Sequence, residues 1–209
     1  GLLRSDGHRI TCTNAENPEW FAATLGGLGL TGLITWVELQ LRRVPGVWFD
    51  TETLRFRRLA DFFELSAQSA HDHEYTVAWV DCTARGAALG RGVFSRGNHA
   101  AQPAGARAPR PVRLRVPFTP PFSLVNGASL RAFNAMHFHR APKVARRASR
   151  HYLPWLFPLD DIREWNRMYG PRGFLQYQCV LPPATAQDGG RELLERVAAS
   201  GAGSFLTVL

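Results

Sequence analysis

Acidic residues and lysine are the scarcest features of this sequence. No aspartate or glutamate occurs between Cys82 and Leu159, and Lys143 is the single lysine among 25 lysines and arginines. The formal net charge is therefore +8 at pH 7. An excess of this size predicts an anionic partner, such as a nucleic acid, a phosphate, an acidic substrate or a phospholipid surface. A strong preference for arginine over lysine can also arise from the base composition of the genome, so by itself this preference assigns no function.

Cysteine and long apolar runs are also scarce. Cys12, Cys82 and Cys179 are widely spaced and form no CxxC pair, which argues against a sulfur-rich zinc site. The odd number argues against a disulfide framework and favours a reducing compartment. No apolar run approaches the roughly 18 to 20 residues of a membrane span, and no signal peptide is visible. The 45% hydrophobic content is globular, which excludes wholesale disorder, collagen and coiled coil.

The length and the ends of the sequence bear on its domain organisation. At roughly 100 to 200 residues per domain, 209 residues make one domain, or one domain and part of another. The sequence begins at Gly1 and ends in an apolar run over 204–209 that is typical of a strand. We expect it to be an internal piece of a longer protein.

Hydrophobic periodicity predicts helices layered on a sheet, the α+β class. The break at Pro45-Gly46 predicts a domain boundary. The expected helices span 18–25, 59–70, about 160–169 and 191–200, and the expected strands span 33–43, 48–56, 75–81, 174–181 and 203–209.

The acid-free stretch at about 83–150 predicts a basic, mobile insertion. It holds more than half of all basic residues, and its part 97–122 is rich in proline, alanine and glycine. Such a stretch suits a nucleic acid, with Phe133, Phe138 and the region of Trp155 for base stacking. It equally suits a phosphate-bearing lipid at a membrane surface, and a solvated linker is the third interpretation.

Three glycines, Gly27, Gly29 and Gly32, match the pattern G-x-G-x-x-G. A dinucleotide fingerprint needs a strand before the glycines and a helix after them. Here the expected helix precedes the glycines and the strand follows, so the pattern predicts a tight helix-to-strand turn. Glycine also lets backbone approach a ligand closely, which leaves a cofactor contact of another kind open.

Two histidine pairs have the spacing at which strand residues share a face, His71 with His73 and His137 with His139. A metal site still needs a third or fourth ligand. The second pair lies in the acid-free stretch, and the first follows an expected helix. We therefore expect solvated histidines and no metal site.

Gln176 and Gln178 lie on one face of an otherwise apolar expected strand, together with Phe174. Burying two amides costs free energy unless each finds hydrogen-bond partners. The pair therefore indicates either a polar ligand cavity, for example for sugar hydroxyls, or the edge of a sheet in water. Spacing alone does not decide between them.

Two segments resemble a known group of flavoproteins. The run from Trp20 to Ile34 (WFAATLGGLGLTGLI) is similar to the end of the flavin domain in the vanillyl-alcohol-oxidase, or PCMH-type, FAD superfamily. The runs Pro158 to Asp160 and Glu164 to Gln178 (EWNRMYGPRGFLQYQ) resemble the narrower family of decaprenylphosphoryl-β-D-ribose 2′-oxidases. The likeness covers nearly the whole chain and is weakest between about 83 and 150.

The resemblance implies a fold and a set of site residues. Residues 1–45 would be the C-terminal part of a PCMH-type FAD-binding domain, and 46–209 an incomplete substrate domain with an antiparallel sheet flanked by helices. Glycines of the first motif and Ile34 would contact FAD, and six further residues would line the substrate pocket. The cofactor contacts are Gly29, Gly32 and Ile34, and the substrate contacts are Trp79, Trp155, Leu159, Arg167, Gln176 and Gln178.

The activity that the resemblance implies is hydride transfer from C2 of a polyprenyl-phosphoryl pentose to flavin, in cell-wall biosynthesis. A short-chain reductase would then reduce the keto sugar, and the basic stretch would meet a membrane, with the protein cytoplasmic or peripheral to that membrane. The resemblance assigns no catalytic acid or base within these residues, and it implies no metal and no nucleic acid.

Departures from the family pattern leave the sugar open. Val77 stands where a small polar residue is expected, and Trp155-Leu156-Phe157 replaces a more polar run. The family's glycine-rich pyrophosphate loop does not occur in this sequence. An alditol or aldonolactone oxidase of the same superfamily is therefore the near alternative. A basic nucleic-acid-binding module is the alternative from another class.

Overall fold

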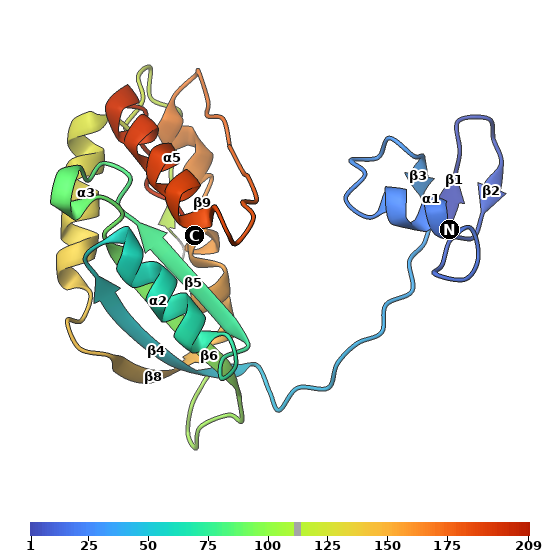
Figure 1. Cartoon of the computed structure of the whole chain (residues 1–209), viewed down its shortest axis with the longest axis horizontal. Coiled ribbons are helices and arrows are strands. Elements are labelled where there is room, and N and C mark those ends of the chain that lie inside the picture. Colours follow the sequence, from blue (N-terminus) through green and yellow to red (C-terminus); the bar gives the residue numbers. More distant parts are fainter. Residues whose placement is uncertain (111–113) are drawn as a thin grey trace. The chain divides into compact units, whose positions relative to one another are not determined.

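The computed structural model describes residues 1–110 and 114–209. Residues 111–113, which fall within the predicted insertion, lie outside the described residues. The chain divides into two compact units, Gly1–Arg43 and Val44–Leu209 (Figure 1). In the described residues the first unit holds one sheet, and the second holds a four-stranded sheet and a two-stranded one.

The N-terminal unit is a small three-stranded antiparallel sheet with one helix. Its strand order is β2-β1-β3, and its elements are β1 (Leu2–Leu3), β2 (Arg9–Ile10), α1 (Pro18–Thr24) and β3 (Leu33–Ile34). The helix predicted over 18–25 is confirmed, and it starts with proline at its first position, where the missing amide hydrogen costs nothing.

The strand predicted over 33–43 is wrong for most of its length. Only β3 pairs in the sheet, and Gly1 extends this pairing to Thr35 and Trp36. Beyond Trp36 the side chains are exposed, with Leu39 at 73% and Leu41 at 80%. An alternating sequence becomes a strand only where another strand bonds to its backbone, and the N-terminal unit offers such a partner only as far as Trp36.

The C-terminal unit is built on a four-stranded antiparallel sheet in the order β5-β6-β4-β8. The strands are β4 (Trp48–Phe56), β5 (Tyr75–Val80), β6 (Gly92–Ala100) and β8 (Arg146–His151). The strand predicted over 48–56 is confirmed to the residue, and the one predicted over 75–81 ends one residue earlier.

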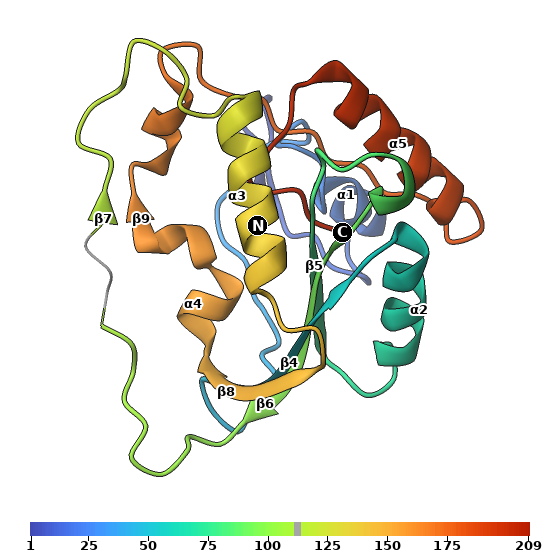
Figure 2. The ribbon, with the colours of Figure 1, turned by 90° about the vertical axis from the view of Figure 1, so that its left-hand side faces the viewer.

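Helices cover both faces of this sheet (Figure 2). On one face lie α2 (Leu59–Ser69) and α5 (Ala186–Ser200), and on the other lie α3 (Gly127–Arg140) and the short α4 (Tyr152–Leu156). The core under α2 and α5 consists of six buried residues: Phe56, Leu59, Ala78, Val80, Phe94 and Leu194. The α+β class with an antiparallel sheet is thereby confirmed.

The interpretation of 83–150 as one mobile insertion needs correction. Strand β6 lies inside the sheet between β5 and β4, and β8 forms its edge. Helix α3 buries Leu130, Asn134 and Phe138. Composition misled the prediction, because the strands accommodate their arginines in two ways. Arg96 of β6 lies on the same face as the buried Phe94 and is neutralised by Glu52, while Arg146, Arg147 and Arg150 of β8 are exposed. Within the described residues, long stretches without regular structure remain on either side of β7 (Leu114–Arg115).

The C-terminal third differs most from the predicted pattern. The helix expected near 160–169 is instead two 3₁₀ helices, η2 (Pro158–Asp161) and η3 (Trp165–Tyr169), around β9 (Ile162–Arg163), which pairs with β7 in parallel. Residues 174–181 form no strand, and Leu175 is 99% exposed. The last residues bond to the free edge of β5 through Ala78 and Val80, with a single bridge from Trp79 to Val208.

Helix α5 begins earlier than predicted and includes Gly189 and Gly190. Gly190 is buried, and a Cβ at this position would lie 3.9 Å from Leu59 Cδ2. This is an ordinary van der Waals distance, so an alanine would also fit where α5 packs on Leu59 of α2. None of the helices in the described part of the chain has the length and apolar character needed to span a bilayer.

Candidate functional site

The sheet face that α3 and α4 cover brings two predicted substrate residues onto one surface, Trp79 from β5 and Trp155 from α4. The cross-strand register places Trp79 opposite Val93 and Val77 opposite Ser95, so these four side chains share a face. Trp155 reaches the same face because its indole Nε1 donates to Ser95 Oγ at 3.0 Å.

Trp79 is held from two sides. Its indole Nε1 donates to the Phe205 carbonyl at 2.8 Å, which ties β5 to the C-terminal segment. Its ring meets His137 of α3 edge to face at 4.5 Å between centroids, and His137 stacks on Phe133. Burial of the imidazole between these rings lowers the pKa of His137, and the Arg140 charge lowers it further. His137 is therefore neutral at neutral pH.

Trp155 closes an aromatic cluster at the other end of this face. Its ring lies 4.7 Å from the Phe49 ring and 6.2 Å from the Tyr75 ring. The Tyr75 hydroxyl lies 3.2 Å from His99 Nε2, while His99 Nδ1 lies 3.2 Å from the Gly46 carbonyl. Because a carbonyl only accepts, Nδ1 carries the proton, and Tyr75 donates to Nε2.

Between the two tryptophans the floor of the sheet is partly open. Val77 is 38% exposed, and beside it Ser95 shares a hydrogen bond of 3.2 Å with Thr53. The surface thus offers two indole rings, an apolar floor and hydroxyl groups. This combination suits an uncharged polar ring, whose C–H faces contact aromatic rings while its hydroxyls bond to polar groups.

A buried ion pair fixes the end of β5 that carries Trp79. Asp81 Oδ2 accepts two hydrogen bonds from the Arg91 guanidinium, and Oδ1 accepts one from Asn134 of α3 at 2.9 Å. Burial raises the pKa of Asp81, but hydrogen bonds from Thr83, Arg91 and Asn134 outweigh it and hold the pKa below its usual value. The ionised carboxylate thereby joins β5, β6 and α3.

Arg167 and Leu159 lie in the 3₁₀ segments. Arg167 Nη1 donates to the carbonyls of Val116 and Pro117 at 3.1 and 2.9 Å, and Arg167 pairs with Glu164. Hydrogen bonding from Arg115, with the Arg167 charge added, lowers the pKa of Glu164. Leu159 is half-buried in η2. Among the described contacts, none joins Arg167 to either tryptophan.

Among the described contacts, none joins Gln176 or Gln178 to this face. Both are exposed in the segment 174–181, which pairs with no strand in the described residues. The strand predicted over 174–181 is therefore wrong, because no neighbouring strand bonds to the backbone N–H and C=O groups of this segment. The role of the two amides stays a prediction.

The three predicted cofactor residues lie together in the N-terminal unit. Gly29 and Gly32 have positive φ angles of 78° and 144°, a region that glycine enters freely. A Cβ on Gly32 would lie 2.5 Å from the Leu3 carbonyl oxygen, so only glycine fits there. Ile34 follows in β3 and is 51% exposed. Gly29, Gly32 and Arg4 line a hollow of about 520 Å³.

The histidine pairs gain no further ligands. Among the described residues, no group of three or more His, Cys, Asp or Glu side chains is placed to hold a metal ion. Ser95, His99 and Tyr75 also lie on this face, although the sequence did not predict them as site residues. The alternating sequence of β6 was a signal that could have identified Ser95 and His99. This strand falls in the region 83–150, where the resemblance is weakest.

Comparison with known proteins extends the resemblance. The chain is 29% identical over 225 residues to a decaprenylphosphoryl-β-D-ribose oxidase of Mycolicibacterium smegmatis, covering 99% of this chain and 47% of that protein. It is 33% identical over 214 residues to an uncharacterized protein of the mprA 5′ region in Streptomyces coelicolor, covering 96% of this chain and 57% of that protein.

No family model matches the chain. The chain spans about half the length of the curated relatives it matches. Almost every residue of this chain nevertheless aligns with the oxidase. The resemblance drawn from two sequence motifs is therefore confirmed: over nearly its whole length, this chain is similar to a decaprenylphosphoryl-β-D-ribose oxidase.

Proposed function

We propose that this chain is part of an FAD-dependent oxidoreductase that oxidises a secondary hydroxyl of a sugar. The observation that carries the proposal is the likeness to an oxidase along 99% of the chain. The shared sheet face of Trp79 and Trp155 supports it, because both residues were expected at a sugar pocket. In this proposal the N-terminal unit is the end of a PCMH-type FAD-binding domain, and the C-terminal unit is the substrate domain.

The residues of the N-terminal unit fit contact with a flavin. Gly29 and Gly32 carry no side chain at the hollow they line, so a planar ring could lie against their backbone. Leu30 and Leu33 add apolar surface to the lining of this hollow, whereas Ile34 is not among its lining residues. The chemistry that FAD supplies when bound is acceptance of a hydride from a carbon that bears a hydroxyl.

The residues of the C-terminal unit would bind and orient the sugar. The indoles of Trp79 and Trp155 would contact its C–H faces, and the amides of Gln176 and Gln178 would bond to its hydroxyls. Leu159 and Arg167 would complete the pocket. Closing these groups around the sugar would exclude water and align the reacting carbon.

The substrate we favour is a polyprenyl-phosphoryl pentose oxidised at C2. Exposed arginines of β8, including Arg146, Arg147 and Arg150, would attract its phosphate or the anionic surface that holds its lipid. The keto sugar would then pass to a short-chain reductase. The protein would act in the cytoplasm or at the membrane surface.

The test uses the longest natural protein that contains these residues. Purified protein should show the visible absorption of oxidised flavin, and a short-chain polyprenyl-phosphoryl ribose should bleach it without oxygen. Bleaching only by a free alditol or lactone would replace the substrate with that of the near alternative. A colourless protein would contradict the proposal and return attention to nucleic-acid binding with steep salt dependence.

A pair of glutamine variants tests the substrate residues. Gln178→Leu removes an amide that we assign to the sugar, and the KM for the sugar should rise roughly tenfold. Gln187→Leu is the matched control, because Gln187 is exposed on α5 and outside the proposed pocket. Equal KM values for the two variants would contradict the assignment of Gln178 to the substrate pocket.

A further inference from the structure

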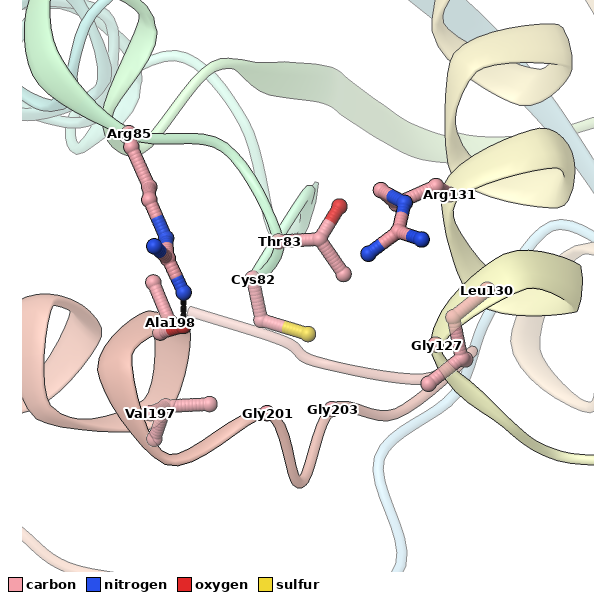
Figure 3. Close-up of a pocket in the computed structure, with 10 residues that line it drawn as sticks. All are labelled: Cys82, Thr83, Arg85, Gly127, Leu130, Arg131, Val197, Ala198, Gly201 and Gly203. Atoms are coloured by element: carbon pink, nitrogen blue, oxygen red, sulfur yellow. Dashed lines mark hydrogen bonds between the residues drawn. The ribbon is translucent and has the colours of Figure 1, made fainter.

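The C-terminal unit contains a second cavity, of about 380 Å³, and none of the predicted substrate or cofactor residues lines it. It lies where the end of β5, the start of α3 and the end of α5 meet (Figure 3). Its volume falls within the range of ligand pockets, roughly 300 to 1,000 Å³. The lining residues are Cys82, Thr83, Arg85, Gly127, Leu130, Arg131, Val197, Ala198, Gly201 and Gly203.

Two guanidinium groups line this cavity, those of Arg85 and Arg131. In the view of Figure 3, Cys82 and Thr83 lie between them. Arg85 donates to the Ala198 carbonyl near the C-terminal end of α5. Throughout residues 1–110 and 114–209, neither arginine forms an ion pair with a carboxylate. The lining therefore carries two positive charges and no negative side chain.

The neighbouring carboxylate does not neutralise these charges. Asp81 precedes Cys82 directly, but both of its oxygens are occupied by Arg91, Thr83 and Asn134. Its side chain is fully buried, so it is turned away from the open space. Two like charges at one cavity repel each other, and an anion bound between them would remove that repulsion.

Glycine keeps the space open. A Cβ at Gly203 would lie 3.2 Å from Leu130 Cδ1 and 3.3 Å from Cys82 Sγ, so any larger residue would crowd the cavity wall. Gly201 has a φ of 74° and ends α5, which turns the chain around the cavity. The remaining wall is aliphatic, from Leu130, Val197 and Ala198.

We propose that this cavity binds a phosphate monoester that carries a short apolar group. The dianionic phosphoryl group matches the two guanidinium charges, and guanidinium bonds to phosphate oxygens are strong and directional. The aliphatic wall takes the apolar group. Because the ligand would join α3, α5 and β5, it would also stabilise the C-terminal unit against unfolding.

The probe is butyl phosphate, titrated calorimetrically into the 209-residue chain in low-salt Tris at pH 8. Butyl phosphate should bind and raise the melting temperature, and inorganic phosphate should bind at least tenfold more weakly. Equal affinities for butyl phosphate and inorganic phosphate would overturn the proposal that the ligand carries an apolar group, because free phosphate would then suffice. No binding of either would overturn the site.

Arginine variants locate the binding. Arg131→Gln removes an exposed charge from α3, so the chain keeps its fold, and butyl phosphate should bind roughly 10- to 100-fold more weakly. Arg191→Gln removes the same charge from an exposed position near the start of α5, outside the cavity, and should leave binding unchanged. An equal loss in both variants would mean attraction by net charge and would overturn the proposal.

Arg85→Lys is the second site variant. Lysine keeps the charge but cannot offer two parallel hydrogen bonds to a phosphoryl group. Binding should weaken severalfold while the melting temperature without ligand changes little. Unchanged binding in both Arg85→Lys and Arg131→Gln would contradict the assignment of the phosphoryl group to these arginines.

Discussion

At the scale of single residues, hydrogen bonds to buried groups decide how the candidate face is held. Trp79 and Trp155 each place the indole N–H on a defined acceptor, the Phe205 carbonyl and Ser95 Oγ. A buried indole without such a partner would cost free energy. The resemblance identified these two tryptophans from the sequence. The structure explains why both lie on one face, because β5 and β6 pair so that Trp79 and Ser95 share that face and Trp155 bonds to Ser95.

Asp81→Asn tests the buried ion pair. The variant leaves the Arg91 guanidinium without its counter-charge, and we expect a loss of about 3 kcal/mol in the free energy of unfolding. Urea unfolding measures it. Glu192→Gln is the control, because Glu192 pairs with Arg196 at an exposed position of α5, and its loss should stay below about 0.5 kcal/mol.

The same carboxylate predicts an acid dependence. The folded chain holds the pKa of Asp81 below its ordinary value of 3.8, so the stability it provides is present above that value. This stability is lost as the pH falls from about 3.8 through the lower pKa of the folded state. The unfolding free energy of Asp81→Asn should fall less steeply than that of the wild type in this range. Parallel curves would show that Asp81 does not contribute.

A double-mutant cycle tests the bond between Trp155 and Ser95. Trp155→Phe and Ser95→Ala should each cost about 1 kcal/mol of unfolding free energy, because each removes the same hydrogen bond. The double variant should cost less than the sum of the two, by about 0.5 kcal/mol or more. Full additivity would mean that the two side chains do not interact in solution.

At the scale of elements, a sequence pattern succeeds where its partner strand is also present. The strand predicted over 48–56 is β4, because β6 and β8 pair with it on both sides. The equally clear alternation over 33–43 and 174–181 gives little or no strand. Hydrophobic periodicity indicates which face of a strand each side chain would lie on. It does not indicate whether a partner strand is present to pair with it.

In the acid-free stretch at about 83–150, strands form where none was predicted. Its composition suggested a linker, yet β6 and β8 are built from it. Arginines on the edge strand β8 keep that edge charged, and charged edge strands resist pairing with other chains. Part of the basic excess therefore has a structural role that net charge alone could not reveal.

Leu175→Ser tests the absence of a strand at 174–181. Leu175 is 99% exposed, so the unfolding free energy of the 209-residue chain should change by less than about 0.5 kcal/mol. A buried strand would lose about 2 kcal/mol or more from the same change. Leu194→Ser is the comparison, because Leu194 is buried in the core at 3% exposure and its loss should be large.

At the scale of the whole molecule, the two units differ in what stabilises them. The C-terminal unit has a helix-covered sheet and a core of large side chains such as Phe56 and Phe94. The N-terminal unit has three two-residue strands, and Leu2 is its one buried apolar side chain among the described residues. A domain's stability grows with the apolar surface it buries, so nearly all of the chain's folding free energy belongs to Val44–Leu209.

Residues 44–209 expressed alone should therefore fold. We expect cooperative unfolding in urea with the same midpoint as the 209-residue chain, because every residue of the core cluster lies within this unit. Residues 1–43 alone should show no cooperative transition, since so little apolar surface is buried there. The measurement is circular dichroism along a urea series for all three proteins. A midpoint that drops sharply in residues 44–209 would show that the N-terminal unit contributes to the stability of the larger one.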